Sequence, residues 1–105
     1  MSKNIAIIEN PLAFIVEDYL KKKLLTDDFS STKIYMILKN ELPYKIFLTF
    51  ESDTLCSKFI EKYHQKKFDT NIDYKLDIVL NEKNLNPEEI KNLIYSNFLM
   101  KTSIG

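Results

Sequence analysis

The sequence predicts an α+β domain: an antiparallel sheet of four strands, two helices packed on one face, and a further helix after the last strand. Three observations predict it. Residues 44–80 read as a strand, an amphipathic helix and another strand. Residues 32–39 alternate apolar and polar side chains, as a half-buried strand does. Residues 11–25 carry apolar side chains three or four positions apart, which is the spacing of one helical face.

The chain is expected to begin with a buried strand and a helix. Residues 4–8 are short, β-branched and apolar, which predicts the strand. Pro11 suits the first turn of a helix, which we expect over residues 11–25. Residues 26–31 then predict a polar loop.

A hairpin is expected next, with strands over residues 32–39 and 44–50 and a turn over residues 40–43. Alternation divides its side chains between two faces. The helix-facing side chains are expected to be Ile34, Met36, Leu38, Tyr44, Ile46, Leu48 and Phe50.

The second half of the chain is expected to form a helix, a strand and a further helix. Ser52 offers a cap for a helix whose apolar positions extend to Tyr63. Residues 71–80 predict the fourth strand, and residues 86–99 predict the last helix, because Asn86-Pro87-Glu88-Glu89 is a favourable helix start. Right-handed crossovers in a β-α-β-β-α-β chain place the strands in the order 4-1-3-2.

Composition limits the functional class. The 105 residues fit one domain, expected over the whole chain with its core at about residues 4–82. Fifteen lysines balance fifteen acidic residues and arginine is absent, so the chain is not a general polyanion binder. Cys56 is the single cysteine, which favours a reducing compartment. No apolar run reaches the roughly 18 residues of a membrane span. We therefore expect a cytoplasmic or nuclear protein that does not enter a membrane.

The order of elements and the third strand resemble the RNA-recognition-motif (RRM) superfamily over about residues 4–82. In that family the third strand carries the signature basic-Gly-aromatic-Gly/Ala-aromatic-aliphatic-any-aromatic. Phe47-Leu48-Thr49-Phe50 matches its last four positions, whereas residues 43–46 do not match its first four. Ala6 stands where the first strand of the family has an aromatic. RNA-binding members usually present three aromatics that stack on bases, and of these three only Phe47 is present here. The resemblance implies a ferredoxin-like, RRM-like fold.

Residues 34–80 are also similar to the divergent RRM-like domain of the BRAP-type RING ubiquitin ligases and to the domain of the Upf-type nonsense-decay cofactors. The shared features are Phe50-Glu51-Ser52, Phe59, Tyr63, Lys67-Phe68 and Asn71-Ile72-Asp73 before an aliphatic strand. In both families this domain is known for protein contacts, which is what the resemblance implies here. Ligase activity does not carry over, because the chain lacks RING ligands.

The sheet face turned away from the helices is the first candidate site. Its expected members are Ala6, Ile8, Lys33, Tyr35, Ile37, Lys39, Lys45, Phe47, Thr49, Lys75, Asp77 and Val79. The candidate contact residues among them are Lys33, Tyr35, Lys39, Lys45, Phe47 and Lys75. Aromatics stack on bases and lysines contact phosphate, so the face suits single-stranded RNA. It equally suits a protein partner, or a solvated face without a ligand.

The expected helix over residues 86–99 is the second candidate site. Its apolar stripe consists of Ile90, Leu93, Ile94 and Phe98. Such a stripe must be buried, either against the sheet of the same molecule or in a groove of a partner.

The remaining motifs do not predict catalysis. Cys56 and His64 lie eight residues apart on one expected helix, about 12 Å along its axis, so they cannot form a nucleophile-base pair. Gly105 is the single glycine, which excludes a glycine-rich phosphate loop. Lysines at positions 58, 62, 66 and 67 predict a solvated face on and just after the same helix. No cofactor or metal site is expected.

The sequence therefore predicts a non-catalytic binding or adaptor module that contacts a protein or ribonucleoprotein partner. One alternative is a single-stranded RNA-binding domain that uses Tyr35 and Phe47. Another is a small subunit or associated factor of the ribosome or another large assembly. A third is a small-ligand regulatory domain or an acylphosphatase-like enzyme, although the latter needs a phosphate-binding arginine that the chain lacks. The sequence does not indicate an oligomeric state.

Overall fold

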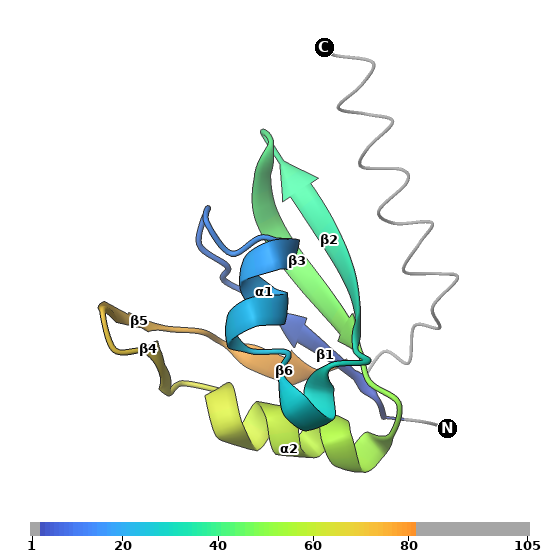
Figure 1. Cartoon of the computed structure of the whole chain (residues 1–105). Helices are drawn as coiled ribbons and strands as arrows, with labels where there is room; N and C mark the ends of the chain where they lie inside the picture. Colours follow the sequence, from blue (N-terminus) through green and yellow to red (C-terminus); the bar gives the residue numbers. More distant parts are fainter. Residues whose placement is uncertain (1–2, 82–105) are drawn as a thin grey trace, which may run out of the picture.

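The computed structural model describes residues 3–81, and every structural statement below concerns this part of the chain. Its main sheet is antiparallel, with strands in the order β2-β3-β1-β6 (Figure 1). These strands are β1 (Ile5–Ile8), β2 (Lys33–Lys39), β3 (Leu42–Thr49) and β6 (Ile78–Leu80). The predicted order is confirmed, with β6 as the fourth strand of this sheet.

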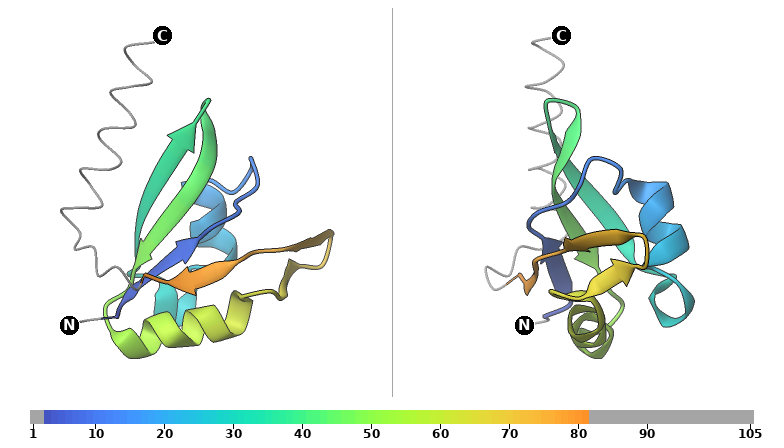
Figure 2. Two further views of the ribbon diagram at one scale, coloured as in Figure 1. Left: turned by 180° about the vertical axis from the view of Figure 1, so that it is seen from behind. Right: turned by 90° about the vertical axis from the view of Figure 1, so that its left-hand side faces the viewer.

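The helices pack against one face of the sheet (Figures 1 and 2). They are α1 (Glu17–Lys23), the short 3-10 helix η1 (Asp27–Phe29) and α2 (Asp53–Tyr63). The α+β class is confirmed. Within residues 3–81, no helix is long and apolar enough to cross a membrane.

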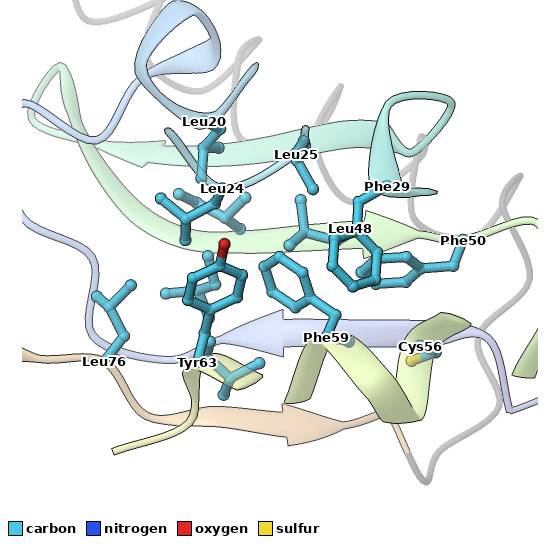
Figure 3. Packing of buried hydrophobic residues seen from close by; sticks show 14 of the residues in the cluster. Leu20, Leu24, Leu25, Phe29, Leu48, Phe50, Cys56, Phe59, Tyr63 and Leu76 are labelled. Atoms are coloured by element: carbon cyan, nitrogen blue, oxygen red, sulfur yellow. The ribbon is translucent and has the colours of Figure 1, made fainter. Parts of the chain in front are cut away.

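The core lies between the sheet and these helices. Its buried side chains are Ala6, Ile8, Ile15, Leu20, Leu24, Leu25, Phe29, Ile46, Leu48, Phe50, Cys56, Phe59, Tyr63, Leu76 and Ile78. Figure 3 shows the aromatic rings gathered around Phe59. The ring centroid of Phe59 lies 5.3 Å from that of Phe29, 5.1 Å from that of Phe50 and 4.9 Å from that of Tyr63. These contacts join η1, α2 and the residue that follows β3.

Helix α2 follows the sequence prediction closely. Ser52 caps it, since its hydroxyl oxygen accepts a hydrogen bond of 3.2 Å from the backbone N–H of Leu55. Cys56, Phe59 and Tyr63 are buried at helical spacing. The predicted face of this helix is confirmed.

Helix α1 begins at Glu17 and not at Pro11 as predicted, so residues 11–16 are not helical. Tertiary hydrogen bonds hold Asn10, the residue just before this segment. The Asn10 side-chain oxygen accepts from the backbone N–H of Asp77 at 2.6 Å, and the Tyr74 hydroxyl donates to the Asn10 carbonyl at 2.8 Å. Ile15 is completely buried in the core from this irregular segment. The spacing of apolar residues predicted that Ile15 is buried, but it did not predict the irregular backbone conformation of residues 11–16.

The loop over residues 26–31 is not purely polar. It contains η1, and the Phe29 side chain is buried in the core. Asp27 adopts a left-handed backbone conformation with φ of 54°, which short polar residues tolerate. The loop thus supplies a core aromatic that the sequence prediction missed.

The β2–β3 turn is tighter than predicted. Lys39 pairs with Leu42, so the loop consists of Asn40 and Glu41, with φ of 53° and 69°. Positive φ at both positions is the geometry of a two-residue type I′ turn. Strand β3 therefore starts at Leu42 and includes Pro43 beside a register shift in β2.

The predicted strand over residues 71–80 is divided. Strands β4 (Lys67–Asp69) and β5 (Ile72–Lys75) form a separate two-stranded hairpin, and only β6 joins the main sheet. Leu76 is fully buried between the two pieces, and Asp77 bonds to Asn10. These contacts turn the chain between β5 and β6.

The helix predicted over residues 86–99 lies outside the described residues. A single domain over residues 1–105 likewise stays a prediction.

Candidate binding surface on the sheet

The sheet face turned away from the helices carries a second apolar cluster. We call this the outer face and define it by Ile5, Ile7, Lys33, Tyr35, Ile37, Lys45, Phe47, Thr49 and Val79. The strand register places one row across all four strands: Tyr35 is opposite Phe47, Phe47 opposite Ile7, and Ile7 opposite Val79. Such cross-strand neighbours have Cβ atoms close enough to contact each other. The row is therefore a continuous apolar strip.

The assignment of β1 to its two faces was wrong in the sequence prediction. Ala6 and Ile8, expected on the outer face, are completely buried in the core. Ile5 and Ile7 occupy the outer face instead. A one-residue shift moves every side chain of a strand to the other face. Both faces of β1 are apolar, so no polar residue marked the outward positions, and the pairing with β3 decides them.

Two predicted contact residues, Tyr35 and Phe47, are brought together as direct cross-strand neighbours. Lys33 lies opposite Thr49 at one end of this pair. Lys45 lies at the other end, opposite Ile37, and its ammonium group pairs with the Glu9 carboxylate.

The other two predicted lysines are not part of the strip. Lys75 lies on the β4–β5 hairpin, opposite Lys67. Lys39 lies at the end of β2, with its ammonium nitrogen 5.2 Å from the ring centroid of Tyr44. Tyr44, predicted to face the helices, is 46% exposed. The outer face is therefore less basic than predicted.

The outer face is also more buried than a solvated sheet face. Phe47 is 5% exposed, and Ile5 and Ile37 are each 7% exposed. Tyr35 and Ile7 are partly buried against them. Base stacking requires an accessible ring, so the burial of Phe47 disfavours the stacking mechanism.

Among residues 3–81, two buried polar atoms on this side of the sheet have no hydrogen-bond partner: the Thr49 hydroxyl oxygen and the Asn81 side-chain nitrogen. Thr49 pairs with Ile5, and the backbone N–H of Asn81 donates to the Ile5 carbonyl at 2.8 Å. Asn81 follows Val79 by two positions, which places both on the same face of the strand. The two atoms therefore flank Ile5. The sequence prediction missed Ile5, Ile7 and Asn81, and only the position of Asn81 two residues after Val79 hinted at its place.

His64 and Lys66, at the end of α2, make contacts within the described structure. The Nδ1 atom of His64 accepts a hydrogen bond of 2.9 Å from the backbone N–H of Ile78. The Lys66 ammonium donates to the Glu61 carbonyl. His64 therefore connects the end of α2 to β6, and its described contact is structural. Within the described residues, no group of three or more His, Cys, Asp or Glu side chains is placed to hold a metal ion.

Cys56 is unsuited to be a nucleophile. Burial, together with the negative charge of Asp53, raises the pKa of the Cys56 thiol from 9.0 to about 11. The thiolate is the reactive form, so a pKa difference of about two lowers the thiolate fraction at pH 8 by about 100-fold.

We expect the folded protein to react with iodoacetamide at pH 8 at least about 100-fold more slowly than the urea-unfolded protein. Both the raised pKa and the burial of the sulfur slow the reaction. Intact mass measured over time gives both rates. Equal rates in the two states would contradict this account of Cys56.

Comparison of the chain with protein-family models, with curated proteins and with solved structures finds no match. The function is therefore inferred from the residues and their arrangement.

Proposed function

We propose that this chain is a non-catalytic binding module that contacts a protein or ribonucleoprotein partner through the outer face. The observation that carries the proposal is the apolar strip of Tyr35, Phe47, Ile7 and Val79 across the four strands. Apolar and aromatic side chains with few charges at the centre are typical of a protein-binding surface. Lys33 and the Lys45–Glu9 ion pair lie beside the strip and supply a polar rim.

The finer fold assignment belongs to this proposal. Apart from the inserted β4–β5 hairpin, the β-α-β-β-α-β order and the order of strands in the sheet support a ferredoxin-like, RRM-like domain. A fold of this kind hosts unrelated functions, so the partner class is argued from the outer face. The ribosome is one ribonucleoprotein assembly that the proposal includes. The lone Cys56 supports a cytoplasmic or nuclear location.

Single-stranded RNA is the second candidate ligand, because Tyr35 and Phe47 are neighbours beside Lys33. Three observations weaken this candidate. Phe47 is 5% exposed, Lys45 pairs with Glu9, and Lys75 lies on another hairpin. The formal net charge of the chain is zero, which removes the general attraction for phosphate.

The test compares two matched substitutions in affinity purification from the source cell, followed by mass spectrometry. Tyr35→Glu introduces a carboxylate into the strip, and Tyr44→Glu introduces one at an exposed position outside it. We expect Tyr35→Glu to lower partner recovery at least tenfold and Tyr44→Glu to leave it unchanged, since a charge at the centre of an apolar interface is costly. Circular dichroism checks that both variants are folded. Unchanged recovery with folded Tyr35→Glu would refute the outer face as the partner site.

A fluorescence titration with mixed-sequence 12-nucleotide RNA separates the second candidate. At 50 mM salt we expect no saturable binding. Saturable binding that is lost in Tyr35→Ala and in Phe47→Ala would establish the RNA alternative instead.

A further inference from the structure

We propose that the edge of β2 that faces away from β3, here called the free edge, binds an extended acidic segment of another protein as an added strand. In the order β2-β3-β1-β6, the main sheet has β2 and β6 at its rims (Figure 1). β2 has seven residues and β6 has three, so β2 offers the longer edge. A long edge strand is a template for another strand. This site goes beyond the proposed function, because backbone groups of β2 carry it and not the apolar strip.

The hydrogen bonds of the neighbouring strands show which backbone groups of β2 point outward. The backbone N–H of Phe50, the residue after β3, donates to the Asn4 carbonyl at 2.8 Å. The backbone groups of Phe50 therefore point toward the β1 side of β3. In an antiparallel sheet, the backbone groups of successive residues point to opposite sides of their strand. Thr49 consequently bonds to β2, where Lys33 is opposite to it.

The same alternation divides the residues of β2 into two sets. Lys33, Tyr35 and Ile37 bond to β3, whereas the N–H and C=O groups of Ile34 and Met36 point to the free edge. Within residues 3–81, these outward groups make no hydrogen bond to another segment. Each of the two residues offers one donor and one acceptor, and alternate residues lie about 7 Å apart along a strand. An extended backbone carries its own donors and acceptors at this spacing, so it is the occupant that the free edge fits.

Two hollows flank the free edge near the start of β2. One, of about 340 Å³, is lined by Glu17 and Lys21 of α1 and lies on the helix side of the sheet. The other, of about 310 Å³, is lined by Thr49 and lies on the side of the outer face. Lys33 and Tyr35 line both hollows. Successive side chains of a strand point to opposite faces of the sheet, so those of an added strand would enter the two hollows in turn.

The charges at the free edge favour an acidic segment of another protein over a second copy of this chain. Lys33 makes no ion pair within residues 3–81, whereas Glu17 is already paired with Lys21 at 2.9 Å. Lys33 lines both hollows, and Glu51 lines only the outer one. A second copy of β2, paired antiparallel over its full length, would place Lys33 opposite Lys39 at both ends. Like charges in opposite positions destabilise a sheet, and an acidic side chain opposite each lysine stabilises it.

Amide hydrogen exchange of the full chain, followed by NMR, tests whether the edge is free. We expect the amides of Ile34 and Met36 to exchange at least tenfold faster than those of Tyr35 and Ile37. Tyr35 and Ile37 are matched controls, because they lie on the same strand and bond to β3. Equal protection of all four amides would show that the edge is already covered, and it would overturn the proposal.

The probe for the occupant is the peptide Glu-Val-Thr-Val-Thr-Val-Glu with blocked ends. Its valines and threonines favour an extended strand, and each end carries a carboxylate. The control peptide has the same side chains and N-methyl groups on its three central residues, which removes their hydrogen-bond donors. We expect the probe to bind with a Kd below about 1 mM and to slow exchange at Ile34 and Met36 at least fivefold at saturation. The control should bind at least tenfold more weakly.

A third peptide, with lysine in place of both glutamates, tests the charge preference and should bind at least fivefold more weakly than the probe. Equal affinity of this peptide would refute an acidic occupant. The edge itself would be refuted by equal affinity of the N-methylated control, by protection confined to residues outside β2, or by no saturable binding at millimolar peptide. None of these readouts uses the partner of the outer face, so failure here is distinct from failure of the proposed function.

Discussion

Replacement of Phe59 by alanine is expected to lower the free energy of unfolding by about 3–5 kcal/mol. Phe59 is completely buried, and its ring contacts those of Phe29, Phe50 and Tyr63. Truncation removes the apolar contact area and leaves a cavity between η1, α2 and the end of the β3 segment at Phe50. Small domains have total stabilities of about 5–15 kcal/mol, so the loss is a large part of the whole. Urea unfolding followed by circular dichroism measures it.

Phe14→Ala is the matched control, because Phe14 is 43% exposed. Its one described ring contact is an edge contact with Tyr19, at a centroid distance of 5.1 Å. We expect a loss below about 1.5 kcal/mol. If the two substitutions had equal effects, Phe59 would not be the centre of the core.

Ile8→Asp is expected to lower the free energy of unfolding by more than about 4 kcal/mol. Ile8 is completely buried between the sheet and the helices, and the described structure offers no cation there to pair with a carboxylate. Isolated charge burial is among the most destabilising single changes. Circular dichroism and thermal melting of the purified variant measure the effect.

Ile7→Asp is the paired experiment, since it makes the same change one residue earlier on the outer face. Ile7 is only partly buried, so a carboxylate there retains some hydration. We expect Ile7→Asp to be less destabilising than Ile8→Asp by at least about 2 kcal/mol. The reverse order would restore the original prediction that Ile8 faces outward.

Two kinds of sequence signal in this chain differ in how well they predict the structure. Helix α2 was predicted closely, because Ser52 caps it and Cys56, Phe59 and Tyr63 have helical spacing. The faces of β2 and β3 were predicted over most of their length, because lysines alternate with apolar residues and mark the outward side. Local patterns suffice where polar and apolar positions differ clearly.

The prediction failed where the local pattern was ambiguous or was overridden by distant contacts. β1 is apolar on both faces, so its register depends on pairing with β3. The start of α1 depends on hydrogen bonds between Asn10 and residues near Asp77, more than 60 positions away. The division of the last predicted strand depends on the same bonds and on the burial of Leu76.

The candidate site shows the same limit. The sequence placed Tyr35, Phe47 and Lys33 on one face of the sheet, and the strand register shows that Tyr35 and Phe47 are direct neighbours. It could not show that Glu9 neutralises Lys45 or that Lys75 belongs to another hairpin, because both facts depend on where separate segments meet.

The sequence by itself determined that this protein is an α+β domain, where α2 begins, and which side chains of β2 and β3 turn away from the helices. Helix and strand propensity, helix capping and the alternation of apolar and polar side chains act over a few residues, so neighbouring positions in the sequence are enough to predict their effect. Only the tertiary structure decided which isoleucines of β1 face outward, where α1 starts, and that a four-strand apolar strip takes the place of a basic platform. These features depend on the pairing of β1 with β3 and β6, which joins residues 38 to 74 positions apart, and on the hydrogen bonds of Asn10 to residues 64 and 67 positions away. The free energy of these distant contacts outweighs local preference.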